Sequence, residues 1–99
     1  MPTLHIINGS SDSGALARCL HAASSGDTLL LIGNGVYLAD AATFAKFRTK
    51  GPGFAWFVLA DDVRTRNLAD RLASDIGLVD DDGFVDLVVA HHPIVSWSA

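Results

Sequence analysis

Two short runs of apolar residues restrict the folds that are open to this chain of 99 residues. Thr28–Ile32 reads TLLLI and Phe54–Ala60 reads FAWFVLA, and neither run alternates polar with apolar residues. Such runs are typical of strands that are covered on both faces, as in a parallel sheet between helices. Both are far shorter than the roughly 20 residues of a membrane-spanning helix. The sequence therefore predicts a buried parallel sheet and no association with a membrane.

The rest of the chain alternates between strand-like and helix-like segments. Further short strands are predicted at Thr3–Asn8, Leu78–Val79 and Ile94–Trp97. Helical spacing of Leu16, Cys19, Leu20 and Ala23 predicts a first helix, and the later ones are predicted at Ala41–Arg48, Val63–Ser74 and Phe84–His91. A chain of this length has room for one core. We expect a single domain, residues 1–99, with a three-layer α/β/α fold and a mostly parallel sheet of about five strands.

Short polar side chains stand directly before the predicted helices. Asp12 or Ser13 is expected to accept hydrogen bonds from the free N–H groups of the first helix, and Asp61 or Asp62 from those of the third. The aspartates before Phe84 are also expected to cap a helix, because negative charge is favourable at the amino end of a helix.

Charge and cysteine content narrow the classes of function. Seven lysine and arginine residues against eleven acids give a net charge of −4, and the basic residues form no stripe, so direct binding of nucleic acid is not expected. A single cysteine excludes an internal disulfide framework, and the amino terminus lacks the features of a signal peptide. These features predict a cytoplasmic protein.

The segment Phe84–His91 lacks the polar side that a surface helix normally has. Hydrophobic residues make up 49% of the chain, and so small a domain cannot cover all of them. Asp86 is the only charged residue of the segment, so we expect this helix to pack on the sheet and also on another chain. Burial of the whole helix within its own domain is the open alternative. The candidate interface comprises Phe84, Val85, Leu87, Val88, Val89 and Trp97.

Cys19 is the only thiol of the chain. It lies about two turns inside its helix, beyond the reach of the helix dipole, and shares a face with Leu16 and Ala23. The pattern favours a small buried hydrophobic residue, and a reactive thiol is the alternative.

The loop after the first strand reads NGSSDSG and contains Ser10, Ser11, Ser13 and Gly14. Small residues between a strand and a helix can bind a phosphate through backbone N–H groups, so this loop is a candidate anion site of a flavin-binding or phosphate-binding module. Helix capping by the same residues is the favoured interpretation. No cofactor is expected, and the four histidines lack the spacing of a metal site.

Four blocks of the sequence together resemble the TusB/DsrH family of sulfur-relay subunits, within the DsrE/DsrF/DsrH-like superfamily. They read LHIINGS, CLHAASSGDTLLLIGNGVYLA, FVLADDVRTRNL and LVDDDGFVDLVVAHHPIVSW, and their order and spacing cover nearly the whole chain. Ser11 and Asn34 depart from the family pattern, which commonly has a proline and an acid there.

The resemblance implies a non-catalytic subunit in a complex with TusC/DsrF-like and TusD/DsrE-like paralogues, usually a dimer of heterotrimers. Such a complex passes persulfide sulfur to a TusE/DsrC-like carrier. In the Tus branch the sulfur ends in 2-thiouridine at the tRNA wobble position, and in the Dsr branch it serves dissimilatory sulfur oxidation. The best understood persulfide cysteine belongs to the TusD/DsrE-type subunit. Cys19 matches a position at which DsrH and many TusB sequences carry cysteine, which makes it a candidate secondary sulfur acceptor.

Overall fold

A computed structural model describes residues 2–10, 13–47 and 53–98 of the chain. One sheet runs through these residues in the strand order β4-β3-β2-β1-β5, and every neighbouring pair is parallel. The predicted α/β fold with a five-stranded parallel sheet is confirmed. The strands are β1 (Leu4–Asn8), β2 (Thr28–Leu31), β3 (Ala55–Leu59), β4 (Gly77–Val79) and β5 (Ile94–Ser98).

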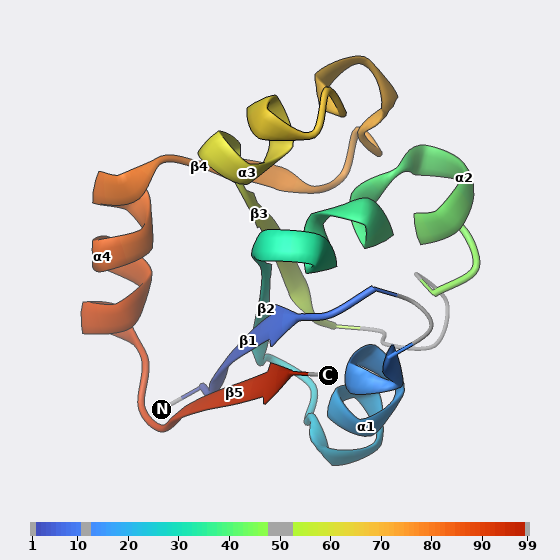
Figure 1. Cartoon of the computed structure of the whole chain (residues 1–99). Helices are drawn as coiled ribbons and strands as arrows, with labels where there is room; N and C mark the ends of the chain where they lie inside the picture. The colour runs from blue at the N-terminus through green and yellow to red at the C-terminus, as the bar shows by residue number, and fades with distance from the viewer. Residues whose placement is uncertain (1, 11–12, 48–52, 99) are drawn as a thin grey trace.

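The order of the strands fixes which face each helix covers. From β1 to β4 the chain moves across the sheet in one direction, and it then returns from β4 to β5 at the opposite edge. Because crossovers between parallel strands are right-handed, the last helix must lie on the face opposite to the others. Figure 1 shows this helix, α4, alone on one side of the sheet. The helical segments are α1 (Ala15–Ala22), η2 (Gly33–Ala39), α2 (Ala41–Phe44), α3 (Ala60–Thr65), η3 (Ala69–Arg71) and α4 (Asp81–Ala90).

The main core lies on the face of the sheet that is covered by α1, η2, α2 and α3. Ile7, Leu31 and Val58 stand in register on three neighbouring strands and are fully buried. Phe44 of α2 packs edge to face against Trp56 of β3, with the ring centroids 4.9 Å apart. All four residues of β2 are buried, as its unbroken apolar pattern predicts.

The predicted helix over Val63–Ser74 is wrong. Helix α3 ends after one and a half turns, and Asn67 then adopts a left-handed backbone with φ of 56°. The reversal still places Leu68 in the core, and the N–H of Ala73 donates to the carbonyl of Ala39 at 2.9 Å. The apolar spacing in this segment therefore reflects packing of a turn against η2, not a continuous helix.

The other helices differ from prediction at their ends. Helix α2 stops at Phe44, and the predicted end at Arg48 lies outside the described residues. Helix α4 begins at Asp81, three residues early, because the Asp80 carboxylate caps it by accepting from the N–H of Gly83 at 2.8 Å. In the described residues no helix is both long and apolar enough to cross a membrane.

The cap of α1 also differs from expectation. Gly14 takes the cap position with φ of 80°, a conformation that glycine adopts without strain. The Ser13 hydroxyl accepts from the N–H of Ala15 at 3.1 Å, one residue outside a regular cap, and Asp12 lies outside the described residues.

Candidate functional site

Helix α4 exposes an apolar surface. Its inner side chains, Phe84 and Leu87, are only half-buried, whereas Val85 and Val89 are 58% and 79% exposed. No residue of α4 is fully buried, so burial of the whole helix within its own domain is wrong. The helix stands in a layer of its own, and in the described part of the chain nothing packs over it (Figure 1). We call the exposed residues Val85, Val88, Val89 and Ile94 the apolar patch.

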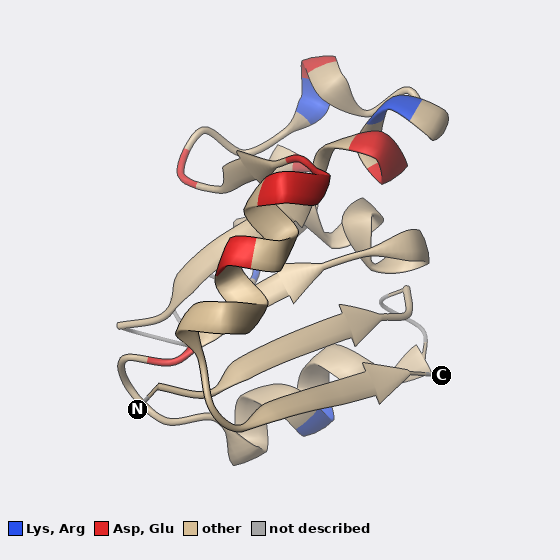
Figure 2. Cartoon of the chain, turned by 90° about the vertical axis from the view of Figure 1, so that its left-hand side faces the viewer, with Lys and Arg blue, Asp and Glu red and all other residues tan. Residues whose placement is uncertain are grey.

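Acidic side chains border the apolar patch. Asp81, Asp82 and Asp86 are exposed, and we call them the acidic rim. At 100° per residue they share the outward arc of α4 with the three valines, and Asp86 lies between Val85 and Val88 along the helix. Figure 2 shows acidic residues along α4 and no basic residue on it. The sequence from Gly77 to Ala99 contains no lysine or arginine at all.

Trp97 is separated from the other candidate interface residues. It pairs with Ile7 in the register of β5 and β1, so its side chain lies on the face of α1 and not on the face of α4. Its indole N–H donates to Nδ1 of His5 at 3.1 Å, and the two rings stack with centroids 6.2 Å apart. The half-buried Trp97 thus fastens β5 to β1 within its own domain.

Sequence reasoning missed a buried pair formed by His5 and Asp27. The His5 Nε2 lies 2.9 Å from an Asp27 carboxylate oxygen, and both side chains are buried. An indole nitrogen can only donate and a carboxylate can only accept, so His5 is neutral and carries its proton on Nε2. Neither ring nitrogen is free to act as a base. The Gly-Asp pair before β2 and the histidine within β1 were the available sequence signals, but 22 residues separate them.

Asp27 is the centre of this network. Its carboxylate accepts from the backbone N–H of Thr3 at 3.1 Å and of Ser24 at 2.9 Å, as well as from His5. Burial alone would raise the pKa of Asp27, but the hydrogen bonds from Ser24, His5 and Thr3 together outweigh burial and lower it. Asp27 is therefore a charged buried group that joins the starts of β1 and β2.

An open pocket of about 730 Å³ lies beside the network. His5, Asp27, Trp97 and the Ser24–Gly26 turn border it. The polar groups of His5 and Asp27 already have hydrogen-bond partners, so this pair offers the pocket no unpaired base or acid for catalysis. We assign the network a structural role at the amino ends of the strands.

The structure places Cys19 in the core, fully buried. Burial, with a smaller contribution from the negative charge of Asp27, raises the pKa of the Cys19 thiol to about 12. The thiolate is the nucleophilic form of cysteine, so the folded chain holds Cys19 in its unreactive form.

Alkylation of Cys19 is expected to be slow in the folded protein. Raising the pKa from 9.0 to about 12 lowers the thiolate fraction at pH 8 by about a thousandfold, before the loss of access is considered. Iodoacetamide labelling followed by mass spectrometry should give a rate at least that much lower in buffer than in guanidinium chloride. Comparable rates in the two solvents would contradict the buried placement.

The candidate anion loop is engaged in contacts of its own. The Ser13 hydroxyl donates to the Ser10 carbonyl at 2.8 Å, and the guanidinium of Arg18 donates to the carbonyls of Ser13 and Ser98. The loop follows β1 where the strand order reverses between β1 and β5, which is where open α/β sheets usually bind ligands. Ser11 lies outside the described residues. The described polar groups hold the loop in place, and the Ser13 hydroxyl also accepts from the N–H of Ala15 although it does not form a regular cap of α1.

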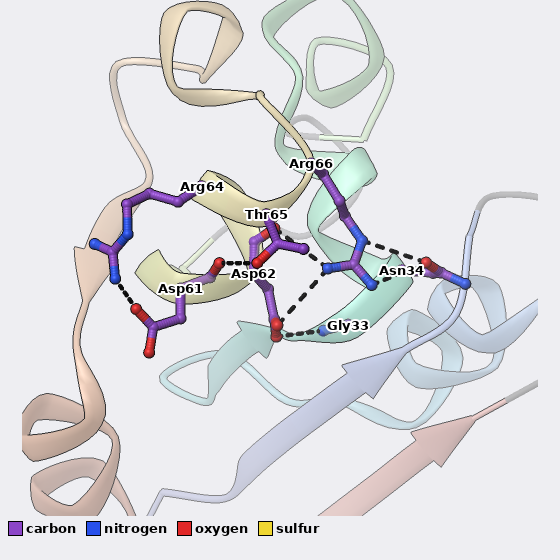
Figure 3. Close-up of polar contacts among 7 residues, drawn as sticks. All are labelled: Gly33, Asn34, Asp61, Asp62, Arg64, Thr65 and Arg66. Carbon is purple, nitrogen blue, oxygen red and sulfur yellow. Dashed lines mark hydrogen bonds and ion pairs between the residues drawn. The ribbon is translucent and has the colours of Figure 1, made fainter.

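A second polar cluster lies at the carboxyl ends of β2 and β3 (Figure 3). Neither Asp61 nor Asp62 caps α3 as predicted. The Asp62 carboxylate instead accepts from the N–H of Gly33 at 2.7 Å, at the start of η2. Arg66 donates to the Asn34 side-chain oxygen at 3.1 Å and joins the same two segments. The cluster fastens η2 to α3.

His91 also has structural partners. Nδ1–H of His91 donates to the carbonyl of Leu87 at 2.7 Å, and its Nε2 lies 2.8 Å from the hydroxyl of Thr28. These contacts tie the carboxyl end of α4 to β2. Among the residues that the structure describes, no group of three or more histidine, cysteine or acidic side chains is arranged to hold a metal ion.

Comparison with known proteins identifies relatives along nearly the whole chain. A family model described as DsrH like protein matches residues 9–94. Protein TusB of Klebsiella pneumoniae strain 342 is 35% identical over 95 residues, which are 95% of this chain and 99% of that protein. Protein TusB of Escherichia coli K12 is 34% identical over 96 residues, 96% of this chain and 97% of its own. Protein TusB of Pectobacterium parmentieri is 28% identical over 94 residues, 95% of this chain and 99% of that protein.

These matches include the loop after β1, the Gly-Asp pair before β2 and helix α4. The family model spans in full the two middle blocks that carry the resemblance, and it includes the end of the first block and most of the last one. The resemblance is thereby confirmed, and the chain belongs to the TusB/DsrH family.

Proposed function

We propose that this chain is a subunit of a cytoplasmic sulfur-relay complex that passes persulfide sulfur toward 2-thiouridine at the tRNA wobble position. The observation that carries the proposal is the family match over nearly the whole chain, with curated relatives named TusB at about one-third identity. The net charge of −4 supports a protein that meets other proteins and leaves contact with tRNA to a later enzyme.

Within that complex the chain acts as an accessory subunit. Its one thiol is buried and held in the protonated form, which is unfavourable for accepting sulfur from a persulfide. The segment after β3, where the TusD/DsrE-type subunit carries its persulfide cysteine, reads LADDVRTRNL and contains no thiol. Sulfur acceptance by Cys19 would require α1 to separate from the sheet.

The partners we propose are TusC/DsrF-like and TusD/DsrE-like paralogues, with a TusE/DsrC-like carrier as the recipient of sulfur. The apolar patch supports this assembly, because four large apolar side chains on one surface favour coverage by another chain. Of the six candidate interface residues, Val85, Val88 and Val89 on the outer side of α4 fit such a contact. Phe84 and Leu87 lie on the inner side of the helix, and Trp97 faces its own domain.

Complementation in cells tests the proposal. Deletion of the gene should abolish 2-thiouridine in tRNA, measured by mass spectrometry of nucleosides, and should prevent co-purification of the two paralogues as one complex. Wild-type protein and Cys19→Ala should restore the modification equally, since the thiol is a packed core atom. Unchanged 2-thiouridine in the deletion strain would contradict the Tus role, and loss of sulfur oxidation in that strain would assign the chain to the Dsr branch.

A further inference from the structure

We infer that the apolar patch and the acidic rim bind a different polypeptide, one whose contact surface has an apolar centre bordered by lysine or arginine, and not a second copy of this chain. The inference rests on the proposed function and adds the charge of the partner surface to it.

The apolar patch lies on the α4 side of the molecule. Ile94 is 41% exposed at the start of β5, on the face of the sheet that α4 occupies, and it follows α4 after a short connection. Val88 and Val89 lie in the last turns of the helix, nearest to this connection. The two elements therefore expose apolar side chains on the same side of the sheet, together with the acidic rim on α4.

A symmetric contact between two copies is opposed by charge. In a two-fold pairing through α4, both sides of the contact carry the same acidic rim, because the same surface is used twice. The segment from Gly77 to the carboxyl terminus supplies four aspartates and no lysine or arginine to offset them. Like charges brought close at an interface cost free energy and select against that pairing.

An asymmetric contact between copies would need a basic surface, and the described residues do not supply one. In the part of the chain that the structure describes, Arg64 and Arg66 pair with acids of α3, and Arg18 donates to backbone carbonyls. Lys46 and Arg71 lie on separate segments. No described surface of this chain combines an apolar centre with a basic border. Arg48 and Lys50 lie outside the described residues. From the surfaces that the structure does describe, we assign the complementary surface to another polypeptide.

A matched pair of charge reversals tests the inference. Asp86→Lys changes the acidic rim, and Asp70→Lys makes the same change of charge at an exposed site on η3. Each variant is co-expressed with the TusC/DsrF-like and TusD/DsrE-like paralogues, and the dissociation constant is measured from 50 to 500 mM NaCl. We expect Asp86→Lys to weaken the complex about tenfold at low salt and to flatten its salt dependence. Asp70→Lys should stay within about twofold of wild type.

A second variant separates the apolar contribution from the electrostatic one. Val89→Ser should weaken the complex by about tenfold and leave the salt dependence unchanged, because it removes buried apolar area and no charge. Thermal unfolding of each isolated variant checks that the fold is retained.

Two results would overturn the inference alone. One is an Asp86→Lys variant that binds the paralogues with the same affinity and the same salt dependence as the wild type. The other is a dimer of the isolated wild-type chain, seen by light scattering, that Val89→Ser dissociates. A wild-type chain that forms no complex with either paralogue would overturn the proposed function together with the inference.

Discussion

Replacement of Asp27 by asparagine is expected to lower the free energy of unfolding by about 3 kcal/mol, because it removes a buried charge while leaving its hydrogen-bond donors in place. The N–H groups of Thr3 and Ser24 and Nε2–H of His5 all donate to the Asp27 carboxylate. An asparagine of the same shape has one acceptor oxygen and would turn its NH₂ toward one of these donors.

The measurement is thermal unfolding of the wild type and the variant at several pH values. A loss of about 3 kcal/mol corresponds to a fall in Tm of roughly 15 °C for a domain of this size. The pKa of Asp27 is lower in the folded chain than its ordinary value of 3.8. Its contribution to stability is therefore complete above that ordinary value and is lost as the pH falls through the folded pKa. The difference between the two proteins should be constant near neutral pH and shrink below pH 3.8.

Asp70→Asn is the control, because it removes the charge of an exposed aspartate on η3. Its effect should stay within about 0.5 kcal/mol. If Asp27→Asn unfolds at the same temperature as this control, the network at the amino ends of the strands does not stabilise the fold.

The sheet could be predicted from the sequence because its signal is local. The runs of apolar residues that form β2 and β3 directly predict parallel strands covered by helices. The segment after β3 could not be predicted in the same way. Leu68 and Leu72 recur at helical spacing, but the left-handed Asn67 breaks the helix between α3 and η3. Spacing alone cannot distinguish a helix from a turn that buries the same leucine.

The candidate site also has one part that the sequence could predict and one part that it could not. Burial of Cys19 follows from its place on the apolar face of α1, so sequence reasoning could anticipate it. The network of His5, Asp27 and Trp97 could not be anticipated, since 92 residues separate the indole from the imidazole that accepts its hydrogen bond. Only the parallel pairing of β5 with β1 brings them together. The same pairing turns Trp97 away from α4, with which it was grouped on hydrophobicity alone.

The strand order also explains why the surplus of apolar residues is concentrated on α4. Every crossover from β1 to β4 adds a segment to one face of the sheet, and these segments cover one another as well as the strands. The single return crossover leaves α4 with the sheet on one side and no neighbouring helix in the described chain. A helix in that position with valines on its outer side favours contact with a partner chain. The strand order that sets the fold therefore also leaves one face of α4 for assembly.

Replacement of Gly35 by alanine is expected to destabilise the fold as strongly as loss of Asp27, for a steric reason. A Cβ atom at Gly35 would lie 2.3 Å from the carbonyl oxygen of Ile7 and 3.2 Å from its carbon, and both are backbone atoms. That oxygen also accepts the N–H of Ile32 at 3.0 Å, so η2 can move away only by disturbing the junction of β1 and β2. Overpacking of this kind costs about 3 kcal/mol.

Gly26→Ala is the matched control, because it separates the cost of a clash from the cost of a conformation. Gly26 has φ of 94°, and a Cβ atom there would meet no atom within 4 Å. Gly26→Ala therefore costs only the strain of an alanine in a left-handed backbone, about 1 kcal/mol. The Tm of this variant should fall by roughly 5 °C, against roughly 15 °C for Gly35→Ala. Equal shifts in the two variants would mean that η2 can retreat from β1 at little cost. The close approach of η2 to β1 would then not be the reason that position 35 requires glycine.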